Sequence, residues 1–219
     1  MDYFVKSGHA EKQRTACVIV GVFSRRKPSS AAQALDQGGG ISSVMRRGDM
    51  DGEPGQTLLL HGLPGLFADR VLLVGCGRER DFDEAAFRKA NTAAARALQA
   101  TGAIDAISFL TELAVKNRDP QWKTKQALLA TDERFYRFDT CKGDSAPRHK
   151  TKLERLTFNL ERRSDLPAGE LGLREALAIS RGVAFAKDLG NLPGNICTPA
   201  YLAEQARELG KRHNKIRVK

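Results

Sequence analysis

A continuous apolar run, Cys17–Phe23 (CVIVGVF), constrains the fold more than any other stretch of the chain. A strand that is apolar at every position has to be buried on both faces, which is typical of a sheet covered by helices. Thr57–His61 and Arg70–Val74 are two further apolar strands, and Gly62–Gly65 between them supplies turn-forming residues. We predict that these two strands pair as a hairpin, which would make the sheet mixed rather than purely parallel.

Helical patterns alternate with short strands along the rest of the chain. Helices bounded by capping residues, glycine or proline are predicted over residues 29–36, 41–47, 81–102, 119–135 and 164–189. Asp81 and Glu84 are interpreted as a capping box that opens the third of these helices. Further strands are predicted at residues 2–6, 106–110 and 156–160, and the last alternates as a strand with one solvent-facing side does. The sequence therefore predicts an α/β fold with a mixed sheet flanked by helices.

The totals of the chain fit a cytoplasmic protein without membrane partners. It has 219 residues, of which 41% are apolar, enough for a sizeable core. There is no apolar run of about 18 residues for a membrane helix, and the first residues lack the apolar middle of a signal peptide. Cys17, Cys76, Cys141 and Cys197 lie far apart, as in a reduced protein rather than a disulfide or zinc framework.

The net charge of +10 favours nucleic acid or other anionic partners. Two basic clusters adjoin turns or strand starts, where side chains can reach phosphates. The candidate nucleic-acid contacts are Arg25, Arg26, Lys27, Arg46, Arg47, Arg148, Lys150 and Lys152, with Arg155 beside the second cluster. No helix-turn-helix or aromatic stacking motif accompanies them, so binding would depend on charge and DNA shape. The alternative is that both clusters are ordinary solvated surface.

Gly75-Cys76-Gly77 follows a predicted strand and resembles part of a phosphate-binding loop. Arg80 stands where the third glycine of GxGxxG belongs, and Asp81 and Glu84 add negative charge. We therefore interpret the glycines as a tight turn and Cys76 as a small buried thiol.

The four histidines are scattered, and no GxSxG motif is present. We assign no catalytic and no metal-binding residue.

The stretch Phe185–Ala206 contains the most specific motif of the chain. Residues 190–195 are rich in helix stoppers, and Thr198 and Pro199 open a new helix. The pattern Asn-x-Pro-x-Asn-x-x-Thr-Pro at residues 191–199 resembles a junction in the leucyl (cytosol) aminopeptidases, peptidase family M17. Gly194 departs from the second proline common in the bacterial motif. Weaker resemblances to that family lie at residues 55–60, 70–77 with 87–90, 136–139 with Lys142, and 178–189.

In that family the junction separates a non-catalytic N-terminal domain from a di-metal catalytic domain. The resemblance implies a macro-domain-like N-terminal fold at residues 1–164, a linker helix at 165–190, and the beginning of the catalytic domain at 191–219. It also implies a homo-hexamer for the full-length enzyme, with two divalent ions, manganese or zinc, in the catalytic domain. The metal ligands and the catalytic lysine and arginine of the family match no residue here, and its Asn-Thr-Asp-Ala-Glu-Gly-Arg run is absent.

The sequence therefore predicts the non-catalytic N-terminal domain of an enzyme that releases N-terminal amino acids, preferably leucine, from peptides. Hexamer assembly and DNA-linked regulation are the expected roles, the latter because some bacterial members of the family also bind DNA. The alternative is a stand-alone macro-like module that binds a nucleotide or ADP-ribose, and a DNA-binding accessory protein is a third hypothesis. We also expect apolar surface around Ile179, Val183, Tyr201 and Leu202, and with it self-association or a disordered tail after Asn191.

Overall fold

The structure is a computed structural model, and it describes residues 1–141 and 151–218. The chain divides into two compact units. The first comprises residues 1–135 and the described residues among 149–178, and it contains the whole sheet. The second comprises the described residues among 136–148 and 179–219.

The first unit is built on a seven-stranded mixed sheet. Its strands are β1 (Asp2–Ser7), β2 (Val18–Phe23), β3 (Lys27–Pro28), β4 (Thr57–His61), β5 (Arg70–Gly77), β6 (Asp105–Ser108) and β7 (Arg155–Leu160). The strand order is β1-β7-β6-β2-β5-β4, and β3 pairs with the end of β2. All neighbours along this order are parallel except β4, which pairs antiparallel with β5 from Thr57 opposite Val74 to His61 opposite Arg70. The predicted hairpin and the predicted mixed sheet are both confirmed.

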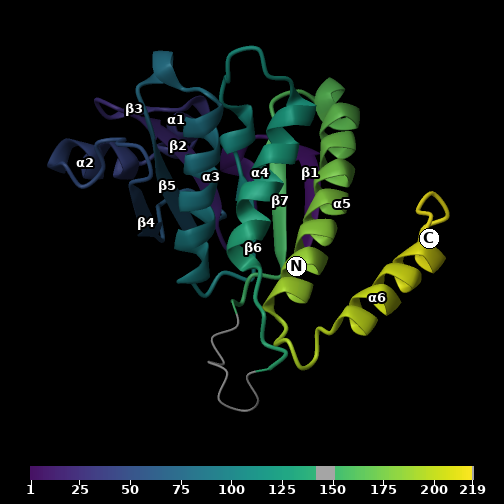
Figure 1. The fold of residues 1–219 in the computed structure, drawn as a ribbon. Helices are drawn as coiled ribbons and strands as arrows, with labels where there is room; N and C mark the ends of the chain where they lie inside the picture. Colours follow the sequence, from purple (N-terminus) through teal and green to yellow (C-terminus); the bar gives the residue numbers. More distant parts are fainter. Residues whose placement is uncertain (142–150, 219) are drawn as a thin grey trace. The chain divides into compact units, whose positions relative to one another are not determined.

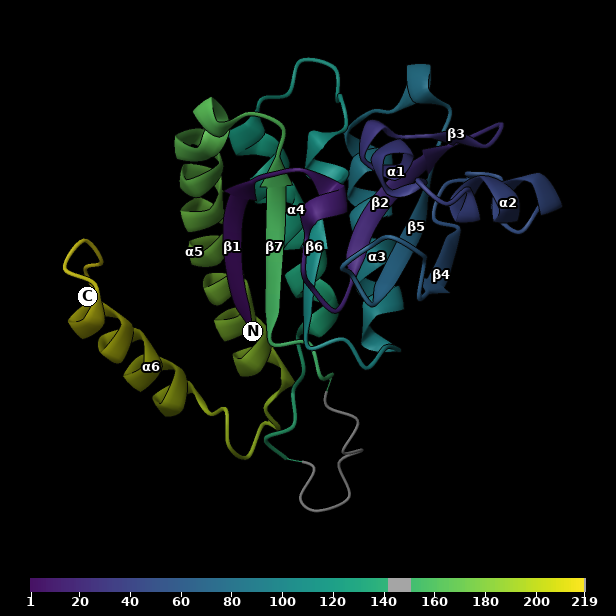
Figure 2. The ribbon, with the colours of Figure 1, turned by 180° about the vertical axis from the view of Figure 1, so that it is seen from behind.

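Helices cover both faces of this sheet (Figures 1 and 2). The helices of the chain are α1 (Ser30–Leu35), α2 (Gly40–Arg47), α3 (Glu84–Gln99), α4 (Pro120–Phe135), α5 (Leu166–Asn191) and α6 (Pro199–Arg212). Short 3₁₀ turns are η1 (Ala10–Lys12), η2 (Glu79–Asp81), η3 (Leu110–Glu112) and η5 (Arg163–Asp165). Helices α3, α4 and the first half of α5 lie on one face, and α1 lies on the other (Figures 1 and 2).

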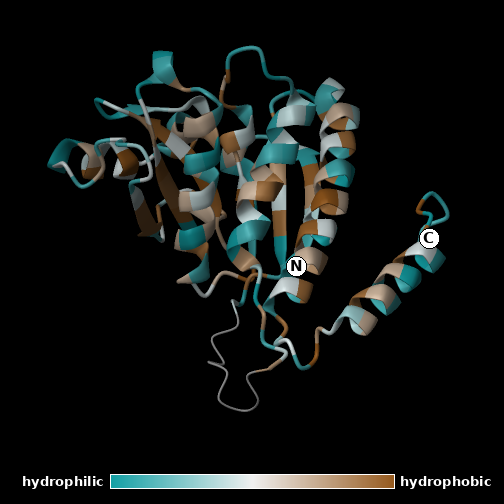
Figure 3. Cartoon of the chain, viewed as in Figure 1, coloured by the Kyte–Doolittle hydropathy of each residue, from teal (hydrophilic) through white to brown (hydrophobic). Residues whose placement is uncertain are grey.

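The apolar strand β2 is the centre of the core, because its side chains alternate between two hydrophobic clusters. Ile19 and Phe23 pack with α3 and α4, whereas Val18, Val20 and Val22 pack with α1 and α2. Strand β5 divides its side chains between the two clusters in the same way. Figure 3 shows hydrophobic residues concentrated in these strands and hydrophilic residues on the outer helix faces. Burial of β2 on both faces, predicted from the sequence, is confirmed.

One predicted helix cap is wrong. Helix α3 is capped by Asp83, whose carboxylate accepts a hydrogen bond from the Ala86 amide at 2.9 Å, and Asp81 belongs to the preceding 3₁₀ turn. The prediction failed because several acceptors stand within reach of this helix start, and only the backbone path selects one. At the start of α2, Asp36 accepts hydrogen bonds from the amides of Ile41 and Ser42 at 2.8 and 3.1 Å.

Strand β7 lacks the predicted solvent-facing side. Its polar residues Thr157 and Asn159 are 7% and 0% exposed. β7 lies between β1 and β6, and Thr111 of η3 donates a hydrogen bond to the Asn159 carbonyl at 2.6 Å. The polar residues of β7 are buried because the neighbouring strands and η3 cover them. The alternation of polar and apolar residues along one strand does not show which other segments will cover it.

The second unit is organised around the end of α5. The Tyr136 hydroxyl donates to Asp188 at 2.8 Å and accepts from Asn191 at 3.1 Å, and the Lys187 ammonium lies 5.1 Å from the centre of the Tyr136 ring. Helix α6 begins as the sequence predicts, with the Thr198 hydroxyl accepting from the Tyr201 amide at 3.3 Å. Among the described residues, no helix combines the length and hydrophobicity needed to cross a membrane.

Candidate functional site

A cavity of about 870 Å³ opens where β2 and β5 end. Its lining comes from the turn after β2, from the loop before β4 and from the segment after β5. Because β2 and β5 run parallel, both present their carboxyl ends here. In open α/β sheets this edge is where ligands most often bind.

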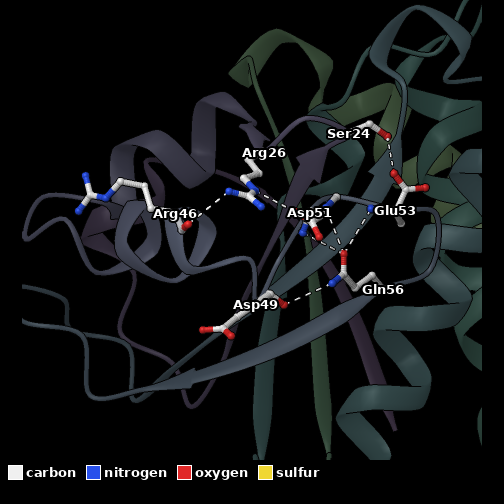
Figure 4. A network of polar contacts seen from close by, with 8 residues as sticks. Ser24, Arg26, Arg46, Asp49, Asp51, Glu53 and Gln56 are labelled. Carbon is white, nitrogen blue, oxygen red and sulfur yellow. Dashed lines mark hydrogen bonds and ion pairs between the residues drawn. The ribbon is translucent and has the colours of Figure 1, made fainter.

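The turn between β2 and β3 carries two arginines in the left-handed backbone region. Arg25 and Arg26 have φ angles of +64° and +61°. The Arg26 guanidinium is held by Asp51 at 2.8 Å and by the carbonyl of Arg46 at 3.3 Å (Figure 4). Arg25 lines the cavity and forms no hydrogen bond or ion pair with the described residues.

The loop before β4 is held rigidly against the strand ends. The Gln56 side-chain oxygen accepts from the amides of Asp51, Gly52 and Glu53 at 3.1, 3.1 and 3.3 Å (Figure 4). A Cβ atom on Gly52 would lie 2.1 Å from the Phe23 carbonyl oxygen, and one on Gly75 would lie 2.0 Å from that of Glu53. Only glycine permits this close backbone approach, so the two positions fix the wall of the cavity.

Gly75-Cys76-Gly77 does not form the predicted tight turn. Strand β5 continues through these residues, and a positive φ of +78° at Gly77 ends it. The Gly77 amide donates to Gly52 and its carbonyl accepts from Ser24, at 2.8 and 2.7 Å. The turn prediction failed because two neighbouring segments supply backbone partners that extend the strand. Since the Gly77 amide is occupied, it is not free to hold a phosphate group.

The interpretation of Cys76 as a small buried thiol is confirmed. Its side chain is 2% exposed, and burial raises the pKa of the thiol to about 12. A thiol that stays protonated and buried is a poor nucleophile.

Charges at the mouth of the cavity are only partly paired. Lys27 forms an ion pair with Glu79, and Arg80 lies 3.6 Å from Asp81. Glu84, just outside the cavity, pairs with Arg118 and with Arg88. Arg25 and Arg78 have no carboxylate partner among the described residues. Both of these arginines line the cavity and are exposed.

The described residues of the two predicted basic clusters lie at opposite ends of the sheet. Arg25, Arg26 and Lys27 follow the carboxyl end of β2, whereas Lys152 precedes the amino end of β7. β7 runs parallel to β2, because both strands are parallel to β6, which lies between them. Arg46 and Arg47 occupy the last turn of α2, and the side chain of Arg46 extends away from the Arg26–Asp51 pair (Figure 4). Arg155 stacks on Phe4, with its guanidinium carbon 5.6 Å from the ring centre. Arg148 and Lys150 lie outside the described residues.

A second polar centre, at the carboxyl ends of β1, β6 and β7, was not predicted. Asn159 donates to the Glu112 carboxylate at 2.6 Å and to the Gly8 carbonyl at 2.9 Å, beside a cavity of about 280 Å³. Burial raises the pKa of Glu112 to about 7 and lowers the pKa of nearby Lys123. The available sequence signal was the asparagine at position 159, near the end of a strand in which polar and apolar residues alternate. Within the described residues, no group of three or more His, Cys, Asp or Glu side chains could hold a metal ion.

The fold and these sites define a mixed α/β domain with a polar cavity at its strand ends, and comparisons place it in a family. Residues 19–145 match the model of the cytosol aminopeptidase family, N-terminal domain. The chain belongs to this family.

Similar proteins cover the whole chain. The "Probable cytosol aminopeptidase" of Thioalkalivibrio sulfidiphilus is 50% identical and the cytosol aminopeptidase of Vibrio cholerae is 48% identical, each over all of this chain. The chain spans 44% of the length of each of these relatives. A solved mutant of tomato leucine aminopeptidase has a TM-score of 0.76 at 22% identity, covering 97% of this chain and 42% of that one. A bottromycin maturation enzyme has a TM-score of 0.66 at 22% identity, covering 90% and 37%. At these identities the two structures show a shared fold.

Proposed function

We propose that this chain supplies the non-catalytic N-terminal part of a metal-dependent aminopeptidase that acts in the cytoplasm. The observation that carries the proposal is the 50% identity over the whole chain to a relative named as a cytosol aminopeptidase. The complete enzyme would release N-terminal amino acids, preferably leucine, from peptides. Two divalent ions, manganese or zinc, would be bound by the part of the relatives that this chain does not span. The names of these relatives favour this assignment over a stand-alone nucleotide- or ADP-ribose-binding module.

Peptidase assays test this proposal directly. The purified 219-residue chain should release no leucine from leucine amide with Mn²⁺ or Zn²⁺ added, because a paired-metal hydrolase needs several carboxylates around two ions. A chimera that joins the chain to the remaining part of the Vibrio cholerae relative should be active. Turnover that follows the chain itself through purification, and not a trace contaminant, would contradict the proposal.

The role of the chain within the enzyme would be assembly, as part of a homo-hexamer. Exposed apolar side chains of the second unit support this role, since Ile179 and Val183 are 45% and 46% exposed and lie four residues apart on α5. Residues four apart share one helix face. Such a face suits contact with the catalytic part or with sister subunits.

DNA binding is a second proposed function, and the arrangement around α2 favours it. The turn after β2 and the last turn of α2 are joined by the bond from Arg26 to the Arg46 carbonyl. This brings the cations of the first cluster to one surface. Arg26 and Lys27 are each engaged by a carboxylate, so Arg25, Arg46 and Arg47 remain for phosphates. Lys152, at the other end of the sheet, would require a separate contact.

Salt-dependent titrations with duplex DNA test this role. The affinity should fall steeply between low and physiological salt and depend little on sequence. Replacing Arg46 and Arg47 by Gln should weaken binding and reduce the salt slope by about one to two. The matched control replaces Arg96 and Arg134, exposed arginines on α3 and α4, and should have little effect. Equal losses in both double variants would indicate a general charge effect and would remove the proposed surface.

A further inference from the structure

The cavity where β2 and β5 end has no part in the proposed aminopeptidase function. Its volume of about 870 Å³ is within the range of small-molecule sites. It lies at the carboxyl ends of two parallel strands, where open α/β sheets most often bind ligands. Its wall is rigid, since Gln56 holds the loop at 51–53 and glycine permits close packing at Gly52 and Gly75.

The unpaired charges indicate what kind of ligand the cavity would accept. Glu79 and Asp81, which would repel an anion, are each next to a cation, Lys27 and Arg80. Arg25 and Arg78 are left without carboxylate partners among the described residues. Glu53 also lines the cavity and has no cationic partner among the described residues, so the lining has four cations and three carboxylates. The net positive charge favours an anion such as a phosphate monoester, whose charge is about −1.5 to −2 at neutral pH. Guanidinium also binds phosphate oxygens in a bidentate manner.

Arg25 lies in the tight turn that joins the antiparallel strands β2 and β3. Arg25 and Arg26 both have a positive φ, as tight turns between antiparallel strands often require. The side chain of Arg26 is fixed by Asp51 and by the Arg46 carbonyl. Arg25, which lines the cavity, is exposed and is left available for a ligand.

The remaining lining suits the organic part of a ligand. Phe23, Pro54 and Ala86 give the cavity apolar surface beside its charged mouth. Glu53 has one weak partner, the Ser24 hydroxyl at 3.5 Å, so its carboxylate can accept from a ligand hydroxyl. We propose that this cavity binds a small organic phosphate monoester, with Arg25 and Arg78 holding the phosphate and the apolar wall contacting the organic body.

Calorimetric titration of the 219-residue chain at physiological salt tests this proposal. The probes are AMP, inorganic phosphate, adenosine and succinate. We expect AMP to bind saturably and inorganic phosphate to bind more weakly than AMP. Adenosine and succinate should both bind with much lower affinity than AMP. Inorganic phosphate that binds as tightly as AMP would refute the contribution of the apolar wall. Adenosine or succinate that binds as tightly as AMP would refute recognition of the phosphate.

Three single variants locate the site. Arg25→Asn and Arg78→Gln should each weaken AMP binding about ten-fold or more, because each removes one charge-assisted contact. Asparagine tolerates the left-handed region, so Arg25→Asn should keep or raise the melting temperature while binding is lost. Arg96→Gln, which removes an equal charge from an exposed position of α3 outside the cavity, should bind AMP as the parent chain does.

The proposal fails if AMP does not bind at concentrations up to about 10 mM. It also fails if Arg25→Asn and Arg78→Gln bind AMP as the parent chain does, or if Arg96→Gln weakens binding as much as they do. None of these results depends on peptidase activity, so the cavity and the proposed aminopeptidase role are tested separately.

Discussion

Glu112 is the residue whose protonation state the fold changes most directly within reach of physiological pH. Burial raises the pKa of its carboxyl group to about 7, the hydrogen bond from Asn159 opposes this shift, and Glu161 and Lys123 are the charged groups that act on it. The folded state therefore binds a proton more tightly than the unfolded state, where the group has its ordinary pKa near 4.3. Stability from this group is present below that value and is lost as pH rises towards 7.

We predict that Glu112→Gln makes the chain less sensitive to pH between about 4.5 and 7.5. Glutamine keeps an oxygen for Asn159 and has no charge to bury. Because water reaches part of the carboxyl group, the gain at pH 8 should be about 1–2 kcal/mol in the free energy of unfolding. Urea unfolding at several pH values measures it. Glu133→Gln, on the exposed side of α4, is the control and should not flatten the profile. An unchanged slope in Glu112→Gln would show that Glu112 titrates normally.

At the scale of elements, the contact between α4 and α5 depends on two glycines. A Cβ atom on Gly172 would lie 2.2 Å from the carbonyl oxygen of Gln121 in α4, and one on Gly169 would lie 2.5 Å from the Leu160 side chain of β7. Both glycines are buried within the first unit. The first half of α5 is therefore part of the domain core, because its backbone lies directly against its neighbours.

We predict opposite effects for two glycine substitutions in α5. Gly172→Ala should destabilise the chain by about 1–3 kcal/mol, because the added methyl group clashes with backbone that cannot move freely. Gly182→Ala has no atom within 4 Å of the added Cβ and should stabilise the helix by about 0.5–1 kcal/mol. Chemical denaturation followed by circular dichroism compares the two. Similar effects of both changes would mean that the α4–α5 contact is looser than the structure shows.

At the scale of the whole molecule, apolar side chains of the second unit remain exposed. Ile179, Val183, Ile196 and Leu202 are 42–46% exposed, and Tyr201 is partly covered. The sequence predicted exposure of Ile179, Val183 and Leu202. Apolar surface of this kind favours association, since burial stabilises by about 25 cal/mol per Å².

We predict that the 219-residue chain self-associates as its concentration rises. The double variant Ile179→Gln/Val183→Gln should shift the equilibrium towards monomer, because it removes apolar area from the exposed face of α5. Ile104→Gln/Leu171→Gln, which changes two exposed apolar residues of the first unit, should not. Sedimentation velocity at several concentrations distinguishes these outcomes. A parent chain that stays monomeric throughout would contradict the prediction.

Features that depend on a single segment could be predicted from the sequence. The apolar residues of β2 predicted a strand that is buried on both faces, and Thr198-Pro199 predicted the start of α6. The β4–β5 hairpin followed from two apolar strands and a short turn. The motif at residues 191–199 and its supporting segments pointed to the family, which the match over residues 19–145 shows.

The tertiary structure decided what depends on neighbours distant in the sequence. Gly75–Gly77 became strand because Gly52 and Ser24 supply hydrogen-bond partners, and Asn159 became buried because η3 covers it. Arg25 and Lys152, one from each basic cluster, lie at opposite ends of the sheet because β2, β6 and β7 are parallel. The cavity exists because three segments meet there, and the pairing of Lys27 with Glu79 leaves Arg25 and Arg78 unpaired. Periodicity reports the environment of a residue along its own element, whereas the partners of its side chain come from the packing of other elements.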